Sequence, residues 1–139
     1  MGETVRPELS KKNKYWIDRH RYYELKHFCL QYPLWKKAYE ILDGVRIYSY
    51  DLVYLSESNV IDDPTGECVE ERSIYLERMR IIEKASIEAD PYLSSYILKG
   101  VTEGLSYNYL KINLNIPCSK DTYYDRYRRF FWLLNKLRG

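Results

Sequence analysis

The chain has 139 residues, of which 45% are hydrophobic and 16% are aromatic, with sixteen tyrosines. This composition allows a buried core in one domain, or in one small domain with an appended helical arm, and excludes a disordered chain. The net charge is +2, but residues 1–50 carry +4, residues 51–103 carry −7 and residues 104–139 carry +5. A basic end beside an acidic middle indicates an anionic partner at the C-terminal end, although a solvated helix surface explains it equally well.

Cysteine spacing and hydropathy bear on the compartment. Cys29, Cys68 and Cys118 are odd in number and lie far apart, which argues against a disulfide framework and favours a reducing cytoplasm. The N-terminus has no apolar secretion signal, and no apolar run is long enough to span a bilayer. We therefore expect a soluble cytoplasmic protein without a membrane partner.

The N-terminal part has the periodicity of two helices. The first is expected from residue 13 or 14 to Gln31. Pro33 stops it and suits the first turn of a second helix, which runs to about Leu42 and ends at Asp43-Gly44.

Residues 45–55 are rich in β-branched and aromatic side chains, which suits a short strand. Because the chain contains no second strand-like run, we expect an extended segment packed on helices. Residues 56–66 have the composition of a loop.

A long charged helix is expected next, with Thr65 as its N-cap and its end near Ala89. Asp90-Pro91 interrupts it and begins another helix, since aspartate caps helices and proline suits their first turn. That helix ends near Lys99-Gly100 or near Glu103-Gly104.

The last third, Leu105–Arg138, reads as a helix-turn-helix. Ser106 and Ser119 are expected to cap its two helices, and Pro117 separates them. One face of the second helix is apolar, formed by Tyr123, Tyr127, Phe130, Leu134 and Leu137. The opposite face carries Lys120, Asp121, Tyr124, Asp125, Arg128 and Arg129.

The predicted fold is therefore all-α, with about six helices. An N-terminal helical arm and linker (1–62) precede a helical domain (63–139) that ends in the helix-turn-helix at 105–138.

Four stretches follow one another along the chain: Gln31-Tyr32-Pro33-Leu34-Trp35-Lys36-Lys37, then Asp63-Pro64-Thr65, then Leu105-Ser106-Tyr107, and finally Ile116 with Ser119, Thr122-Tyr123-Tyr124 and Arg128-Arg129. In this order and spacing they resemble the phage late-gene transcriptional activators of the RinA/ArpU type, whose C-terminal part is similar to region four of sigma factors. Pro117-Cys118 in the turn and Asp125 in the last helix depart from the family pattern. The resemblance implies sequence-specific binding upstream of a phage gene block, in the cytoplasm of a bacterial host cell, with RNA polymerase as a further candidate contact.

The residues themselves predict how such a domain reads duplex DNA. The first turn of the last helix, Ser119, Lys120, Asp121 and Thr122, is the turn that reaches base edges in this docking mode. Lys120, Arg128 and Arg129 are expected to neutralise phosphates, and Ser106 with the amides of its helix to hold another. Tyr124 completes the set of expected DNA-binding residues. Helix capping explains Ser119, Asp121 and Thr122 at least equally well, and packing against a partner subunit explains Tyr124 and Trp132.

Other chemistry finds little support in the sequence. His20 and His27 lie seven residues apart without a ligand cluster to complete a metal site, and the six glycines form no phosphate-binding loop. We therefore expect no enzyme activity, cofactor or metal. A protein-binding module that inhibits or redirects a host or defence complex is the alternative to a DNA-binding regulator, because aromatic residues are abundant and the middle is acidic. Self-association, as a homodimer or another homo-oligomer, is expected under both hypotheses.

Overall fold

The computed structural model describes residues 12–44 and 64–139, and in these residues the regular structure is entirely helical. The helices are α1 (Arg19–Leu30), α2 (Tyr32–Gly44), α4 (Pro64–Ala89), α5 (Ser94–Glu103), α6 (Tyr107–Leu114) and α7 (Lys120–Arg138). The all-α prediction, with about six helices, is confirmed. The expected extended segment at 45–55 lies outside the described residues.

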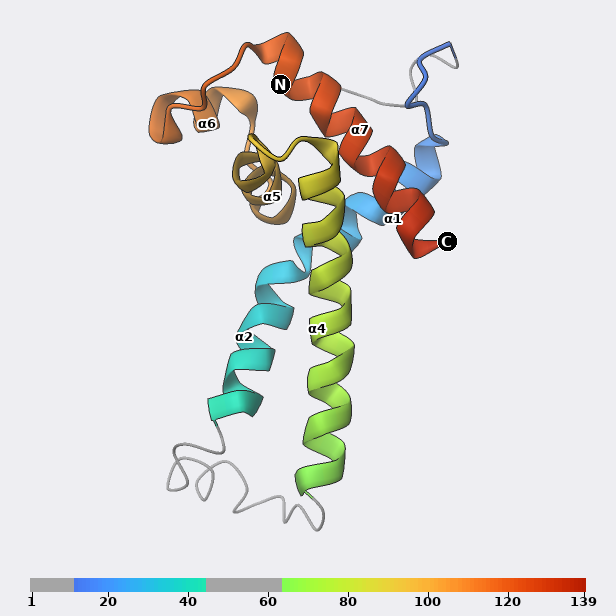
Figure 1. Ribbon diagram of the computed structural model, residues 1–139, viewed down its shortest axis with the longest axis vertical. Helices are drawn as coiled ribbons and strands as arrows, with labels where there is room; N and C mark the ends of the chain where they lie inside the picture. Colours follow the sequence, from blue (N-terminus) through green and yellow to red (C-terminus); the bar gives the residue numbers. More distant parts are fainter. Residues whose placement is uncertain (1–11, 45–63) are drawn as a thin grey trace.

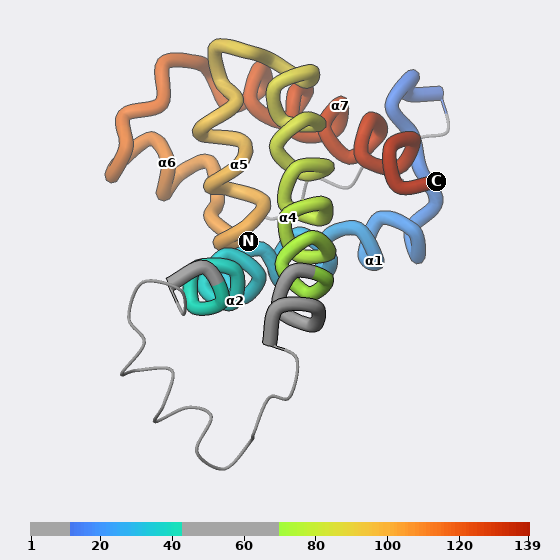
Figure 2. The backbone as a smooth tube through the Cα atoms, turned by 60° about the horizontal axis from the view of Figure 1, so that its bottom comes forward, coloured from blue at the N-terminus to red at the C-terminus, as the bar shows by residue number. Residues whose placement is uncertain are grey.

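The helix α4 forms the long axis of the molecule (Figure 1). Beside its N-terminal half runs α2, while α7 crosses near its C-terminal end and α5 and α6 lie to one side of that end (Figures 1 and 2). The helix-turn-helix segment is thus at one end of the molecule, and the far end of the α2–α4 pair is at the other.

One hydrophobic core joins these helices. Its largest fully buried members come from α1, α4, α5, α6, the turn after α6, and α7: Leu25, Cys29, Ile82, Ile97, Leu110, Ile116, Tyr123, Phe130, Phe131 and Leu134. The ring of Tyr22 on α1 packs edge-on against that of Phe131 on α7, with centroids 5.1 Å apart. The described part of the expected arm (1–62) therefore belongs to the same core as the C-terminal helices, because burying α1 covers the apolar face of α7.

The structure corrects the expected start of the first helix. It begins at Arg19, where Asp18 caps it by accepting a hydrogen bond of 3.0 Å from the His20 amide. Residues 12–18 form turns and extended chain instead, and Tyr15 and Ile17 are buried there. Periodicity alone did not distinguish a helical turn from a segment that packs across another helix.

Two further boundaries differ from expectation. The long helix begins at Pro64, so Thr65 lies inside its first turn and is not the N-cap. Proline suits that position because its φ is fixed and it has no amide hydrogen to leave unpaired. The helix after Asp90 begins at Ser94, three residues beyond Pro91. It ends at Glu103, the second of the two expected ends, with Gly104 as its C-cap at φ of 69°.

Candidate nucleic-acid interface

The turn between α6 and α7 is held by buried groups. Asn115 ends α6 in the left-handed region with φ of 52°, and its amide donates to the Lys111 carbonyl. The next amide, from Ile116, donates to the Leu110 carbonyl at 3.3 Å, and the Ile116 side chain is fully buried. This closing pattern is typical of helix C-termini. It fixes the chain direction before Pro117, where no helix can continue.

Tyr107 ties α6 to the start of α7. Its hydroxyl donates to the Cys118 carbonyl at 2.6 Å, across the turn. Its amide donates to the Tyr124 hydroxyl at 3.3 Å, and its ring lies 5.9 Å from that of Tyr123. Tyr124 is therefore half-buried and contributes to holding the two helices together, a contact that the helical pattern did not predict.

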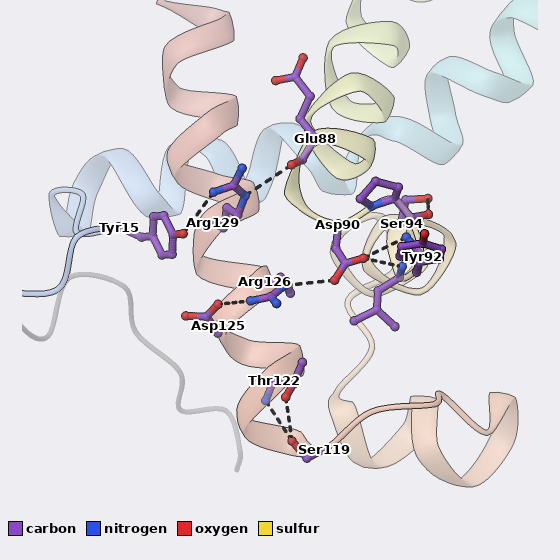
Figure 3. Close-up of polar contacts among 12 residues, drawn as sticks. Tyr15, Glu88, Asp90, Tyr92, Ser94, Ser119, Thr122, Asp125, Arg126 and Arg129 are labelled. Carbon is purple, nitrogen blue, oxygen red and sulfur yellow. Dashed lines mark hydrogen bonds and ion pairs between the residues drawn. The ribbon is translucent and has the colours of Figure 1, made fainter.

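Ser106 and Ser119 cap α6 and α7, as predicted. The Ser106 hydroxyl accepts from the Tyr109 amide at 3.2 Å. The Ser119 hydroxyl accepts from the Thr122 amide at 3.2 Å and donates to the Thr122 hydroxyl at 3.0 Å (Figure 3). Each cap satisfies an amide that the helix leaves without a partner. Base or phosphate contacts by these residues remain a prediction.

The first turn of α7 is open to solvent. Ser119, Lys120 and Asp121 are exposed, whereas Thr122 is half-buried. Behind this turn, Tyr123 is completely buried and anchors it to the core. The expected apolar face is confirmed: Phe130 and Leu134 are also fully buried, and Tyr127 and Leu137 pack against the core while partly exposed.

The later turns of α7 are covered by the segment that precedes α1. The Tyr15 side chain is only 7% exposed, and its ring lies 5.5 Å from that of Trp132. Arg129 donates to the Tyr15 hydroxyl at 3.2 Å and, more weakly, to the Glu88 carbonyl at 3.4 Å (Figure 3). Burial acts to raise the pKa of Tyr15, but hydrogen bonds from Arg129 and Lys14 outweigh it and lower the pKa below its usual value. Arg129 thus has an intramolecular function that sequence reasoning missed.

Arg126, which the sequence analysis did not select, joins α7 to the loop between α4 and α5. Its Nε donates to Asp90 Oδ2 at 3.0 Å, and its Nη1 pairs with Asp125 (Figure 3). The other Asp90 oxygen accepts from the amides of Tyr92 and Leu93. The hydrogen bond that Arg126 donates to Asp90, together with the contact to Asp125, raises the pKa of Arg126. The negative charge of Asp125 is therefore paired within the protein.

The other basic side chains of α6 and α7 differ in how accessible they are to a ligand. Lys136 lies 3.5 Å over the Trp132 ring, and Arg138 lies 4.0 Å over the Phe28 ring. Arg128 is half-buried, and its Nε is enclosed without a hydrogen-bond partner among the described residues. Lys111 and Lys120 are exposed. Cation–π contacts leave a charge partly accessible, but the two lysines are the side chains best placed to meet a polyanion.

Comparison of the chain with protein-family models, with curated proteins and with solved structures finds no match. Within residues 12–44 and 64–139, no helix has the length and apolar character needed to cross a membrane. The same residues contain no group of three or more histidine, cysteine, aspartate or glutamate side chains placed to hold a metal ion.

Proposed function

We propose that this protein binds duplex DNA through the α6–α7 pair and regulates transcription. The observation that carries the proposal is the exposed first turn of α7, which the buried Tyr123 anchors to the core. In helix-turn-helix proteins, this turn of the second helix contacts base edges, and the preceding helix lies across the backbone. The resemblance to the RinA/ArpU-type activators supports the same function and adds RNA polymerase as a candidate contact.

The close packing behind this turn supports the reading of base edges in DNA rather than loose electrostatic attachment. Tyr123, Ile116 and Leu110 are fully buried, so α6, the turn and the start of α7 are parts of one packed unit. A reading helix must present its side chains in a fixed geometry, because each hydrogen bond to a base edge depends on direction as well as distance.

The charges suggest a small electrostatic footprint. Lys111 and Lys120 are exposed on the two helices, whereas Arg126 and Arg129 are occupied by contacts within the protein. Each lysine that neutralises one phosphate contributes about 0.9 to the slope of log K against log salt concentration. With two such contacts per protomer, binding is expected to be weak unless two protomers act together.

The test is fluorescence anisotropy with labelled duplexes from the genomic neighbourhood of the gene, titrated at several salt concentrations. We expect Lys111→Ala/Lys120→Ala to weaken binding on every duplex and to reduce the magnitude of the salt slope by about 2 for each bound protomer. The matched control is Lys36→Ala/Lys37→Ala, which removes two exposed lysines from α2. Equal affinity and slope in both variants, or no binding by the wild type at low salt, would exclude this interface.

A protein-binding function is the second candidate, and one observation favours it. Ile112 is 79% exposed and Tyr109 is 47% exposed on α6, and Tyr92 is 91% exposed on the loop before α5. Exposed aromatic and large aliphatic side chains are common in the centres of protein interfaces. This function predicts a stoichiometric complex with a host protein and little affinity for duplex DNA. Ile112→Asp is expected to disrupt the complex, whereas Asn113→Asp, which adds the same charge at the next exposed position, is the matched control.

A further inference from the structure

The outward face of α4 carries a groove that the core does not use. The groove has a volume of about 470 Å³ and is lined by Ser73, Leu76, Glu77, Arg80, Ile81, Lys84 and Leu137. All but Leu137 come from α4; Leu137 is near the C-terminal end of α7. The apolar members are half-buried, while Ser73, Glu77, Arg80 and Lys84 are exposed.

These exposed residues form a continuous stripe. Ser73, Glu77, Arg80 and Lys84 follow one another at steps of four, three and four residues, which places them along one side of a helix. The opposite side of α4 is committed to the core through Met79, Ile82, Ala85, Ser86 and Ala89. The stripe is therefore available for a second helix to lie against.

Glu77 and Lys84 are placed self-complementarily along the stripe, and they oppose one like-charge contact between the two Arg80 side chains beside the axis. The acidic member, Glu77, and the basic member, Lys84, lie on opposite sides of the midpoint between Arg80 and Ile81, each at three and a half residues, or about 5 Å along the axis. When two copies of α4 run antiparallel about a twofold axis at this midpoint, Glu77 of each copy lies level with Lys84 of the other. A twofold interface repeats each such contact, so it forms two opposite-charge pairs.

Lys84 is available for such a pair. Its only ion pair among the described residues is with Glu88 at 3.9 Å, and the two side chains are 62% and 43% exposed. A contact this long between exposed groups contributes little, so Lys84 can turn to a second carboxylate at small cost. Leu76, Ile81 and Leu137 provide apolar surface beneath the charges.

We propose that the protein forms a homodimer in which the α4 helices pack antiparallel across this groove, with Glu77 and Lys84 paired between subunits. The pairing does not depend on DNA binding. It also places the Ala89 ends of the two α4 helices about 26 Å apart along the helix direction. Ala89 of each copy is eight and a half residues from the midpoint, so the two ends are separated by seventeen residues at about 1.5 Å each. Since α7 crosses α4 near that end, the two α6–α7 pairs are carried outward in opposite directions, as two successive half-sites would require.

The experiment is a charge swap measured by sedimentation equilibrium on the full chain, without DNA. Glu77→Lys and Lys84→Glu, each alone, convert two attractive pairs into two repulsive ones. We expect each to weaken dimerisation roughly thirtyfold, from about 1 kcal/mol per pair. The double variant, Glu77→Lys/Lys84→Glu, restores opposite charges and is expected to return to the wild-type dimerisation constant.

The control is Lys37→Glu, a charge reversal at an exposed position of α2 outside the groove, which leaves dimerisation unchanged. Circular dichroism checks that each variant stays folded, which the exposure of both charged side chains favours. A wild type that remains monomeric up to about 200 µM overturns the proposal. So do single variants that dimerise like the wild type, and a double variant that stays as weak as the single ones.

Discussion

Gly100, in the middle of α5, provides the sharpest test of the packing that holds the candidate interface. A Cβ atom added there would lie 2.3 Å from the Tyr123 hydroxyl oxygen and 3.5 Å from Leu110 Cδ1. The first distance is far below van der Waals contact. Tyr123 is fully buried, with the rings of Tyr107, Tyr124 and Tyr127 at centroid distances of 5.9, 5.0 and 6.1 Å. Its hydroxyl oxygen is buried as well, so moving it away from the new Cβ requires the ring or its neighbours to shift.

Two opposing effects decide the outcome of Gly100→Ala. Replacing glycine by alanine inside a helix stabilises it by about 1 kcal/mol, because glycine loses more backbone entropy. Overpacking a filled core costs about 1–3 kcal/mol. In the wild-type background we expect the clash to prevail and the free energy of unfolding to fall by up to about 2 kcal/mol.

Tyr123→Phe removes the atom responsible for the clash. Its hydroxyl is buried without a hydrogen-bond partner among the described residues, so its loss is expected to be neutral or stabilising. In this background Gly100→Ala is expected to change sign and to stabilise the protein by about 1 kcal/mol.

Urea denaturation followed by far-ultraviolet circular dichroism measures all four proteins of the cycle. The expected coupling free energy is about 1–3 kcal/mol, well above the error of such cycles. If Gly100→Ala destabilises equally with tyrosine and with phenylalanine at position 123, the close approach does not govern this site and the reasoning fails.

Two further predictions concern ionisable groups. Asp90→Ala is expected to lower the free energy of unfolding by about 2–4 kcal/mol. The substitution removes the acceptor of the Tyr92 and Leu93 amides and the partner of Arg126. A urea midpoint within error of the wild type would contradict this. Burial raises the pKa of Tyr123 in the folded state, so stability is retained below the unfolded-state value near 10 and lost as the pH rises above it. Tyr123→Phe should remove about 1 kcal/mol of the stability that is lost between pH 10 and 11, measured from urea midpoints at the two pH values.

Local sequence signals were sufficient where the deciding interactions are themselves local. The caps Ser106 and Ser119, the end of α4 at Ala89 and the buried stripe of α7 were all predicted, and the structure confirms them. Each depends on residues within one or two helical turns of one another, so spacing and residue type are enough.

Contacts between distant parts of the chain could not be read in this way. Tyr15 and Trp132 are 117 positions apart, and nothing in either neighbourhood indicates that their rings meet. The same applies to Arg126 and Asp90, and to Arg129 and Tyr15. Such contacts change the interpretation of the C-terminal helix, because they occupy basic side chains that charge counting alone assigns to a polyanion.

The sequence by itself determined that the described residues are mainly helical, where their helices end, where α6 and α7 begin, and which face of the last helix is buried. Helix caps, breakers and hydrophobic periodicity act over a few residues and are written into the order of the side chains. Only the tertiary structure decided which cations on that helix remain exposed and that the segment before α1 covers its later turns. Those outcomes depend on how helices pack across the core, where partners far apart in sequence compete with solvent for the same charged and aromatic groups.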